Sequence, residues 1–566
     1  MARGGVNLPD QPGVKDRMSW QTPEIARGWV WVRRRVGALL VGCVAATGPA
    51  IANDDEQART PMPRIDGQLR ERLAGGVLRW GGDAEGGAPF QLRDPHDPER
   101  LIGFEVELAD SLAAALSGRH GLRLATEFVQ YEWDSLPLGL QKRDFDLILS
   151  GLEITPENQQ QMRFSRPYYI YTQQLVVRRD EKRINALEDC LDRPVGTLAG
   201  SAARQILERA GIRQIVSFSG QVEPYLDLEL GRLDAVLLDA PIAIFYAAGN
   251  PRLRAAGQPL GKGAYGIGLR HEDGVLAMAL DEALAELMVG ARLRDIYRKW
   301  HLWNAMQSQL ARQPNRVAEL AGLGFTPDGQ PATVTDAPRE QVDINLMAAS
   351  AELWTFDRYA PTLLKAAGMT VFLTFTSMGL AMIVGLLVCL SRLYGPALVR
   401  YVALMYVEFF RGTPLLLLLF FLYFGLAHYG AHMSAVITAI VGFGLNYAAY
   451  EAEIYRSAIV SVHAGQWEAS RALGMRDGLT FRRIIFPQAL RTALPPMTND
   501  LVALFKDTSL VSVIAVPDLT KEYLILSRSS FKFVELGLLT AALYLAMSIP
   551  LGYLSRGLER RWGRVR

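Results

Sequence analysis

The sequence predicts an α/β soluble region followed by an all-α membrane region of about five transmembrane helices. Residues 67–310 alternate short apolar stretches with helical patterns, which is typical of an α/β fold. Four later runs lack Asp, Glu, Lys and Arg, and a helix needs roughly 20 apolar residues to cross a bilayer core. These runs are 366–391, 412–428, 433–450 and 536–555. At 566 residues the chain is also too long for a single core.

Residues 1–52 are predicted to be an export signal or an N-terminal anchor. Three arginines, Arg33 to Arg35, precede an apolar stretch, and the small residues Ala50-Ile51-Ala52 form a candidate cleavage site. Three fates remain open for this segment: cleavage after Ala52, retention as an anchor, or lipidation at Cys43.

Charge and cysteine content exclude several classes of function. The 60 Lys and Arg residues nearly balance the 58 Asp and Glu residues, so no nucleic-acid-binding surface is indicated. Cys43 and Cys389 fall in apolar runs, which leaves Cys190 alone in the soluble region; we expect no metal site and no disulfide framework. No nucleophile–base arrangement stands out either, so an enzyme is not indicated.

The segment 493–516 is the least regular of the expected membrane elements. Pro495 and Pro496 interrupt it, and Lys506 and Asp507 lie inside it. A short or broken helix that contacts protein rather than lipid fits these residues better than a regular span. Counting this segment gives five spans.

Basic residues near the span ends indicate the orientation of the chain in its membrane. Arg392 and Arg400 flank the first short loop, and five further arginines follow the last span. Such residues stay in the cytoplasm. With five spans, the residues before Lys365 then lie outside, so residues 67–310 are expected on the outer, periplasmic side.

Seven segments of the soluble region occur in the order found in the solute-binding proteins of polar amino-acid importers, and the region resembles that family. They are Leu101–Ala109, Glu132–Leu136, Phe145–Gly151, Phe164–Tyr169, Val195-Gly196, Gly200-Ser201 and Leu233–Asp239. The resemblance implies a two-lobed α/β clamp over residues 67–305. One lobe is expected to contain about 67–175 and 270–305, the other about 178–265, with crossover strands near Leu175–Arg179 and Tyr265–Leu269.

The resemblance also implies where a ligand binds. In the family an Arg holds the carboxylate of an amino acid, because a planar guanidinium makes two charge-assisted hydrogen bonds. The N-terminal helix turn at Gly200-Ser201 assists, Asp239 takes the ammonium group, and Trp133 packs the side chain. The candidate ligand-binding residues are Asp83, Trp133, Ser150, Gly151, Glu153, Asn158, Gly200, Ser201 and Asp239.

The chain departs from the family pattern at the expected carboxylate site. The family reads Ser-Gly-Met-Thr-Ile-Thr-Pro-Glu-Arg, but here Glu153 replaces the first Thr and Asn158 replaces the Arg. A family aromatic residue falls on Gly86 or Gly87. The pocket thus loses a positive charge and gains a negative one, which favours a cationic solute without an α-carboxylate over a standard amino acid. Two alternatives stay open at these positions. Arg163 or Arg166 restores the carboxylate site, or both are solvated surface residues. Separately, Glu153 is itself a surface residue if the local alignment slips.

The membrane region resembles the permeases of polar amino-acid ABC importers (the histidine, glutamate, glutamine, arginine and opine type) over about 355–560. Glu408–Leu415 and Lys506–Leu510 carry the resemblance together with a polar segment at 464–490. This segment corresponds to the family's coupling loop, which docks an ATPase. The Glu-Ala-Ala triplet reads Glu468-Ala469-Ser470, and Gly474 and Pro487 keep their spacing. Its candidate contact residues are Gln466, Glu468, Ala469, Arg471, Gly474 and Pro487.

The resemblance implies an importer subunit for a small polar solute, either an amino acid or a related amine. No phosphate-binding Gly-x-x-x-x-Gly-Lys-Ser/Thr motif is present, so this chain is expected to bind no cofactor. ATP and Mg would be used by a separate ATPase. One permease domain per chain implies a homodimer with two ATPase copies, surrounded by membrane lipid.

A linker at 306–352 joins the clamp to the permease domain, residues 353–566. Tethering the clamp raises its concentration at the permease to roughly the millimolar range. Two alternatives use the same parts. A ligand-gated channel carries a similar outer domain but has no use for an ATPase-docking loop. A sensor needs a signalling region, which does not follow Arg566 in this sequence.

Overall fold

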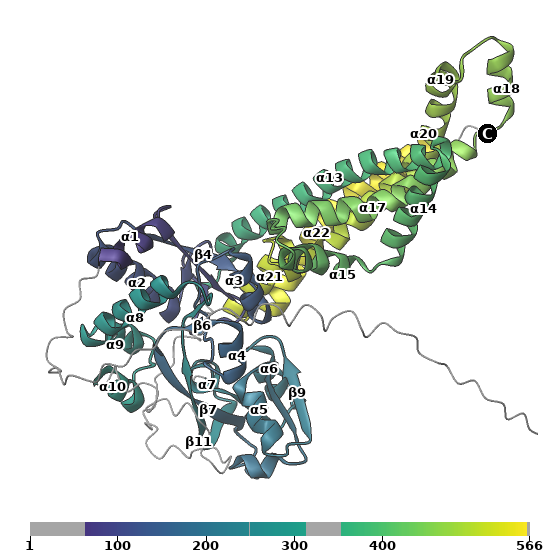
Figure 1. The fold of residues 1–566 in the computed structure, drawn as a ribbon. Helices are drawn as coiled ribbons and strands as arrows, with labels where there is room; N and C mark the ends of the chain where they lie inside the picture. Colours follow the sequence, from purple (N-terminus) through teal and green to yellow (C-terminus); the bar gives the residue numbers. More distant parts are fainter. Residues whose placement is uncertain (1–62, 248–249, 313–352, 563–566) are drawn as a thin grey trace, which may run out of the picture. The chain divides into compact units, whose positions relative to one another are not determined.

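The computed structural model describes residues 63–247, 250–312 and 353–562 (Figure 1). The predicted export segment 1–52 and most of the expected linker 306–352 lie outside these ranges. The described residues form two lobes built on separate mixed sheets, followed by a long helical region, as predicted.

The first lobe is a five-stranded sheet in the order β4-β1-β5-β12-β6. β1 pairs in parallel with β4 and β5, whereas β12 runs antiparallel to its neighbours β5 and β6. β5 is buried on both faces, as expected for a strand covered by helices. The strands are β1 (Val77–Gly82), β4 (Ala125–Gln130), β5 (Leu147–Ile148), β6 (Arg163–Phe164) and β12 (Gly268–Leu269), with a separate pair β2 (Leu92–Arg93) and β3 (Leu101–Ile102).

Helices pack on this sheet through apolar positions spaced four residues apart. In α2 (Phe104–His120), Leu108, Leu112 and Leu116 are each fully buried. Gly121 then ends this helix in the left-handed region at φ 62°, where glycine has no steric penalty. The other helical elements of the lobe are α1 (Pro63–Arg72), η1 (Trp133–Ser135), α3 (Leu136–Lys142), α4 (Pro156–Gln161), α8 (Gly274–Val289) and α9 (Arg292–Lys299).

The second lobe has the sheet order β11-β7-β10-β8-β9. Its central strand β10 is buried at every position and pairs in parallel with β8 and antiparallel with β7. The strands are β7 (Tyr169–Arg178), β8 (Pro194–Leu198), β9 (Gln214–Phe218), β10 (Ala235–Asp239) and β11 (Leu253–Tyr265). Its helical elements are η2 (Leu187–Cys190), α5 (Ala202–Arg209), α6 (Glu223–Glu229) and α7 (Ala240–Ala247).

The chain crosses between the two sheets twice. It leaves the first sheet after β6 and enters the second at Tyr169, and it returns between Tyr265 and Gly268. The first crossover was expected near Leu175–Arg179, and the structure corrects this position, since those residues lie within or just after β7. The clamp continues through α10 (Ala305–Arg312), where Gln307 bonds the backbone of Ile170, so part of the expected linker packs on the clamp.

The helical region contains three helices that are long and apolar enough to cross a membrane, or up to four if the bent α14–α15 segment is one span. This count applies to the described residues and rests on length and composition. The three are α13 (Phe356–Tyr394), α17 (Ala435–Val460) and residues Phe533–Tyr553 of α22 (Phe533–Trp562). Five were expected; the fifth, at 493–516, falls on α20 (Phe486–Asp507) and the following 3-10 helix and does not meet that test.

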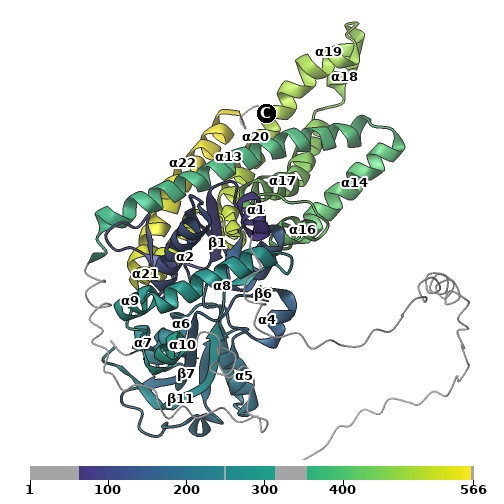
Figure 2. The ribbon, with the colours of Figure 1, turned by 60° about the vertical axis from the view of Figure 1, so that its left-hand side comes forward.

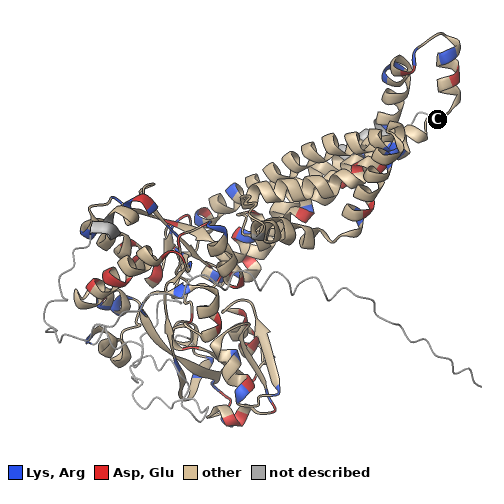
Figure 3. Ribbon diagram, in the orientation of Figure 1, with Lys and Arg blue, Asp and Glu red and all other residues tan. Residues whose placement is uncertain are grey.

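The remaining helical elements pack against these helices or against one another. Figure 3 shows few charged residues along the middle of the long helices and more toward their ends, as a bilayer core requires. The remaining elements are α14 (Ala397–Gly412), α15 (Leu415–Phe420), the π-helical turn η3 (Phe421–Gly425), α16 (Leu426–His428), η5 (Thr508–Ile514) and α21 (Leu519–Ser530).

The polar segment between α17 and α20 forms a helical hairpin that projects beyond the ends of α13 and α17 (Figures 1 and 2). It consists of α18 (Gly465–Ala472), α19 (Asp477–Thr480) and the π-helical turn η4 (Phe481–Ile485), which continues into α20. This hairpin spans the 464–490 segment identified in the sequence.

Candidate functional site

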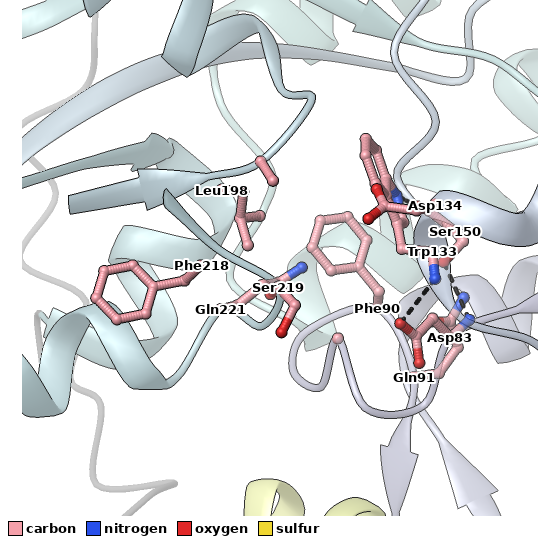
Figure 4. A pocket seen from close by; sticks show the side chains of 12 residues that line it. Asp83, Phe90, Gln91, Trp133, Asp134, Ser150, Leu198, Phe218, Ser219 and Gln221 are labelled. Atoms are coloured by element: carbon pink, nitrogen blue, oxygen red, sulfur yellow. Dashed lines mark hydrogen bonds between the residues drawn. The ribbon is translucent and has the colours of Figure 1, made fainter. Parts of the chain in front are cut away.

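A small cavity of ≈ 30 Å³ lies between the two lobes of the clamp. The first lobe lines it with Asp83, Gly86, Phe90, Gln91, Trp133, Asp134 and Ser150, and the second with Leu198, Ala199, Phe218, Ser219 and Gln221. Figure 4 shows the two sets facing each other, with the Phe90 ring between them. The space is only large enough for water, so an amino-acid-sized ligand requires the lobes to separate first.

Three of the expected ligand residues form the wall of the first lobe and are tied to one another. Asp83 Oδ2 accepts a hydrogen bond from the Trp133 backbone N–H at 3.1 Å, and Ser150 Oγ accepts one from the Asp83 N–H at 3.2 Å. The indole of Trp133 donates to the Ser150 carbonyl at 3.2 Å. The second Asp83 oxygen accepts from Glu85 and Gln130. Asp83 therefore fixes the loops of this wall.

Two glutamines that line the cavity, one from each lobe, have an amide oxygen without a donor among the described residues. The Nε2 of Gln91 donates to Glu105 at 2.8 Å and to the Leu149 carbonyl at 2.6 Å, and its buried Oε1 has no partner in the described part of the chain. The same holds for the buried Oε1 of Gln221 among these residues. Buried acceptors normally have donors, so these two oxygens are suited to a ligand rich in N–H groups.

Asp134 also lines the cavity, and it lies exposed at the edge. Desolvation and the nearby Asp83 carboxylate raise the pKa of Asp134 above its usual range. No Lys or Arg lines the cavity in the described part of the chain. A cation would supply the charge that this cavity does not provide.

Glu153, Asn158 and Asp239 do not line the cavity. Asp239 accepts hydrogen bonds from Gln173 at 2.6 Å and from the Tyr265 hydroxyl. The Asn158 side chain donates to the Glu153 carbonyl at 2.9 Å, so it stabilises the start of α4. Burial raises the pKa of both Glu153 and Asp239, and their mutual proximity contributes to the shift at Glu153.

The glycines and the serine of the expected site shape the edges of the cavity. Gly151 and Gly200 both have positive φ, 58° and 69°, and a side chain at Gly151 would meet the Phe90 ring at 2.8 Å. The Gly151 N–H donates to Glu105 at 2.7 Å, which keeps this turn in place. Ser201 caps α5, since its Oγ accepts from the Arg204 N–H at 3.3 Å.

Arg163 and Arg166 do not supply a carboxylate site. Both lie near α8: Arg163 approaches Gly274, and the backbone N–H of Arg166 donates to Asp281 at 2.6 Å. The aromatic residue assigned to Gly86 or Gly87 by the sequence pattern is provided instead by Phe90, which lines the cavity. Sequence reasoning missed Phe90, Gln91, Asp134, Phe218 and Gln221; only Asp134, adjacent to Trp133, carried a sequence signal.

The hairpin α18–α19 presents polar side chains to solvent. Gln466, Glu468, Ala469, Arg471 and Gly474 are all exposed, and Pro487 is half-buried near the start of α20. Arg471 pairs with Asp477 at 3.0 Å, which braces the two short helices. At the tip, Leu473 lies beside Gly474 and is 79 % exposed. The sequence analysis selected Gly474 but not Leu473.

Helix α21 of the membrane region places two cations against clamp carboxylates. Lys521 contacts Glu85 at 2.5 Å and also pairs with Glu132, and Arg528 pairs with Glu85 and, at 2.7 Å, with Glu223. Glu85 and Glu132 belong to the first lobe and precede the cavity residues Gly86 and Trp133. Glu223 belongs to the second lobe. Arg528 therefore contacts both lobes.

Two family models match the chain. Residues 78–302 match bacterial extracellular solute-binding proteins, family 3, and residues 368–564 match the binding-protein-dependent transport system inner membrane component. Over 202 residues the chain is 42 % identical to the probable amino-acid ABC transporter permease protein YckA of Bacillus subtilis, covering 36 % of this chain and 89 % of the relative. The chain belongs to the amino-acid ABC importer family, as a solute-binding domain fused to a permease.

Further similarities cover the same two domains of this importer component. The glutamine transport system permease protein GlnP of Escherichia coli (strain K12) is 36 % identical over 203 residues, 36 % of this chain and 93 % of that protein. The structure of an ancestral arginine-binding protein bound to arginine is 30 % identical, with a TM-score of 0.36, and covers 40 % of this chain and 98 % of that one. The chain is thus a transport component and not a catalytic subunit, and it is a multi-pass membrane protein.

Proposed function

We propose that this importer component captures a cationic amino acid or a related amine in the cavity between its lobes. The observation that carries the proposal is the pair of buried amide oxygens, Gln91 Oε1 and Gln221 Oε1, for which the described residues supply no donor. An ammonium or guanidinium group supplies such donors, and Asp134 supplies the opposite charge. The rings of Phe90 and Trp133 add cation–π and packing contacts.

The other expected ligand residues have supporting parts in this proposal. Asp83, Ser150 and Gly151 hold the first-lobe wall, while Gly200 and Ser201 form the second-lobe edge beside it. Asp239 secures the crossover strands through Tyr265 and Gln173. Closure of the lobes around the ligand then brings both walls into contact with it.

The permease part is proposed to work as a homodimer in the bacterial cytoplasmic membrane, with the clamp on the outer side. Two copies of an ATPase subunit dock on the two α18–α19 hairpins through Gln466, Glu468, Ala469, Arg471, Gly474 and Pro487, and they use ATP and Mg. The exposure of the hairpin and its projection beyond the long helices support this assignment (Figure 1). Hydrolysis by the partner switches the pathway between outward and inward access.

A comparison of ligands on the full chain in detergent tests the cationic preference. We expect arginine-like amines to raise the unfolding temperature and glutamate to have little effect, because glutamate brings a second carboxylate to a cavity without a cation. Asp134→Asn should weaken amine binding by about tenfold, the effect of roughly 1.4 kcal/mol. Asp110→Asn, on the outer face of α2, is the matched control. Tighter binding of glutamate than of amines would refute the proposal.

A further inference from the structure

The Glu153 side chain reaches from the first lobe to the second. Glu153 is 4 % exposed and lies two residues beyond Gly151 at the cavity edge. Its Oε2 accepts a hydrogen bond from the backbone N–H of Ala202 at 2.9 Å. Ala202 is the first residue of α5 in the second lobe, so this bond joins the lobes.

A helix N-terminus has free N–H groups and a partial positive charge, so it attracts anions. In α5 two of these groups have partners within the chain. The Ala202 N–H donates to Glu153, and the Arg204 N–H donates to the Ser201 hydroxyl. Glu153 thus takes the place that an external carboxylate would take at this helix.

This helix end borders the ligand cavity. A Cβ atom built on Gly200 would lie 3.7 Å from the Trp133 ring and 3.9 Å from Asp134 Oδ1, both of which line the cavity. The start of α5 therefore borders the cavity. A ligand carboxylate in the cavity would lie beside Asp134, and no Lys or Arg among the described residues lines the cavity to offset the two negative charges.

We propose that Glu153 is a specificity-determining residue that fills the anion position of α5 and so excludes ligands with a carboxylate. The inference rests on the proposed capture of a cationic solute and narrows its class to amines without a carboxylate. Because the same bond joins the two lobes, Glu153 replaces a contact that a ligand carboxylate would otherwise make during closure. The clamp then closes on an amine without needing the ligand to reach α5.

Agmatine and L-arginine test this inference directly, because they differ by the α-carboxylate and share the guanidinium. With the full chain in nanodiscs, we expect calorimetry to show agmatine binding at least about tenfold more tightly than arginine, the size of one charge-assisted hydrogen bond. Glu153→Thr should raise arginine affinity by about tenfold or more. Glu153→Gln keeps an acceptor of equal length and should retain the preference for agmatine. Glu157→Thr, on the exposed face of α4, is the matched control.

Hydrogen exchange at the start of α5 gives a readout that needs no ligand. In the wild type we expect the Ala202 amide to be protected; Glu153→Thr should reduce this protection about tenfold, and Glu153→Gln should keep it. Unchanged protection in Glu153→Thr, or unchanged arginine affinity despite lost protection, overturns the inference. If neither agmatine nor arginine binds, the proposed cationic solute fails, and the exchange result still decides whether Glu153 occupies α5.

Discussion

Gly474 offers the sharpest test that solute capture and transport are separate events. This glycine follows the last turn of α18 with φ +75°, and its N–H donates to the Arg471 carbonyl at 2.9 Å. A Cβ atom added there meets nothing within 4 Å, so Gly474→Ala applies backbone strain without a clash. The left-handed conformation costs an L-residue about 1–2 kcal/mol.

That strain lowers the ratio of the observed hairpin conformation to its alternatives by a factor of about 5–30. We expect uptake by proteoliposomes that contain the chain and its ATPase subunit to fall by up to the same factor. Gly474→Asp adds a negative charge to the proposed docking surface and should abolish uptake. Amine binding, measured by calorimetry on the same preparations, should stay within about twofold of the wild type, because the hairpin does not touch the cavity.

Gly478→Ala is the matched control for this substitution. Gly478 lies in α19 of the same hairpin, has no neighbour within 4 Å of an added Cβ, and does not have a positive φ. We expect it to preserve uptake. Equal losses in Gly478→Ala and Gly474→Ala would show that strain at Gly474 is not the cause. Loss of amine binding in Gly474→Asp would refute the separation of capture from transport.

The hydrophobic pattern was sufficient to predict the fold class, but it did not predict where the chain passes from one sheet of the clamp to the other. Long uncharged runs such as 366–391 predicted membrane helices by their length, and α13 contains that run. The position of the first crossover was wrong because Leu175–Arg179 has the same β-branched composition as the rest of β7. The hydrophobic pattern of strands does not mark where the chain passes from one sheet to the other, since buried strands of either sheet have the same pattern.

The site was predictable where family spacing fixes a residue and unpredictable where contacts come from distant segments. Trp133 and Ser150 line the cavity as expected. Gln91 could not be selected, because its unpaired oxygen results from two acceptors, Glu105 and Leu149, that hold its nitrogen. Glu153 was identified as unusual from the sequence. Its bond to α5 depends on how close the lobes lie, which no local pattern encodes.

Two further predictions concern charged groups of the clamp. Burial and Asp239 raise the pKa of Glu153 to about 8 in the folded state, so its ionisation destabilises the fold. Stability should therefore fall as pH rises from about 5 through 8. In thermal unfolding across that range, Glu153→Gln should make the dependence of stability on pH shallower. An unchanged dependence would show that other groups cause it. In the second, Lys521→Glu places like charges against Glu85 and Glu132, where Lys521 is 1 % exposed on its side chain. Uptake should fall at least about tenfold, since disrupting a buried pair costs roughly 3–5 kcal/mol. Adding Glu132→Lys restores opposite charges at this contact. Partial recovery of uptake in the double variant would distinguish a specific contact from general damage to the fold. No recovery at all would show that this pair does not connect the clamp to the permease.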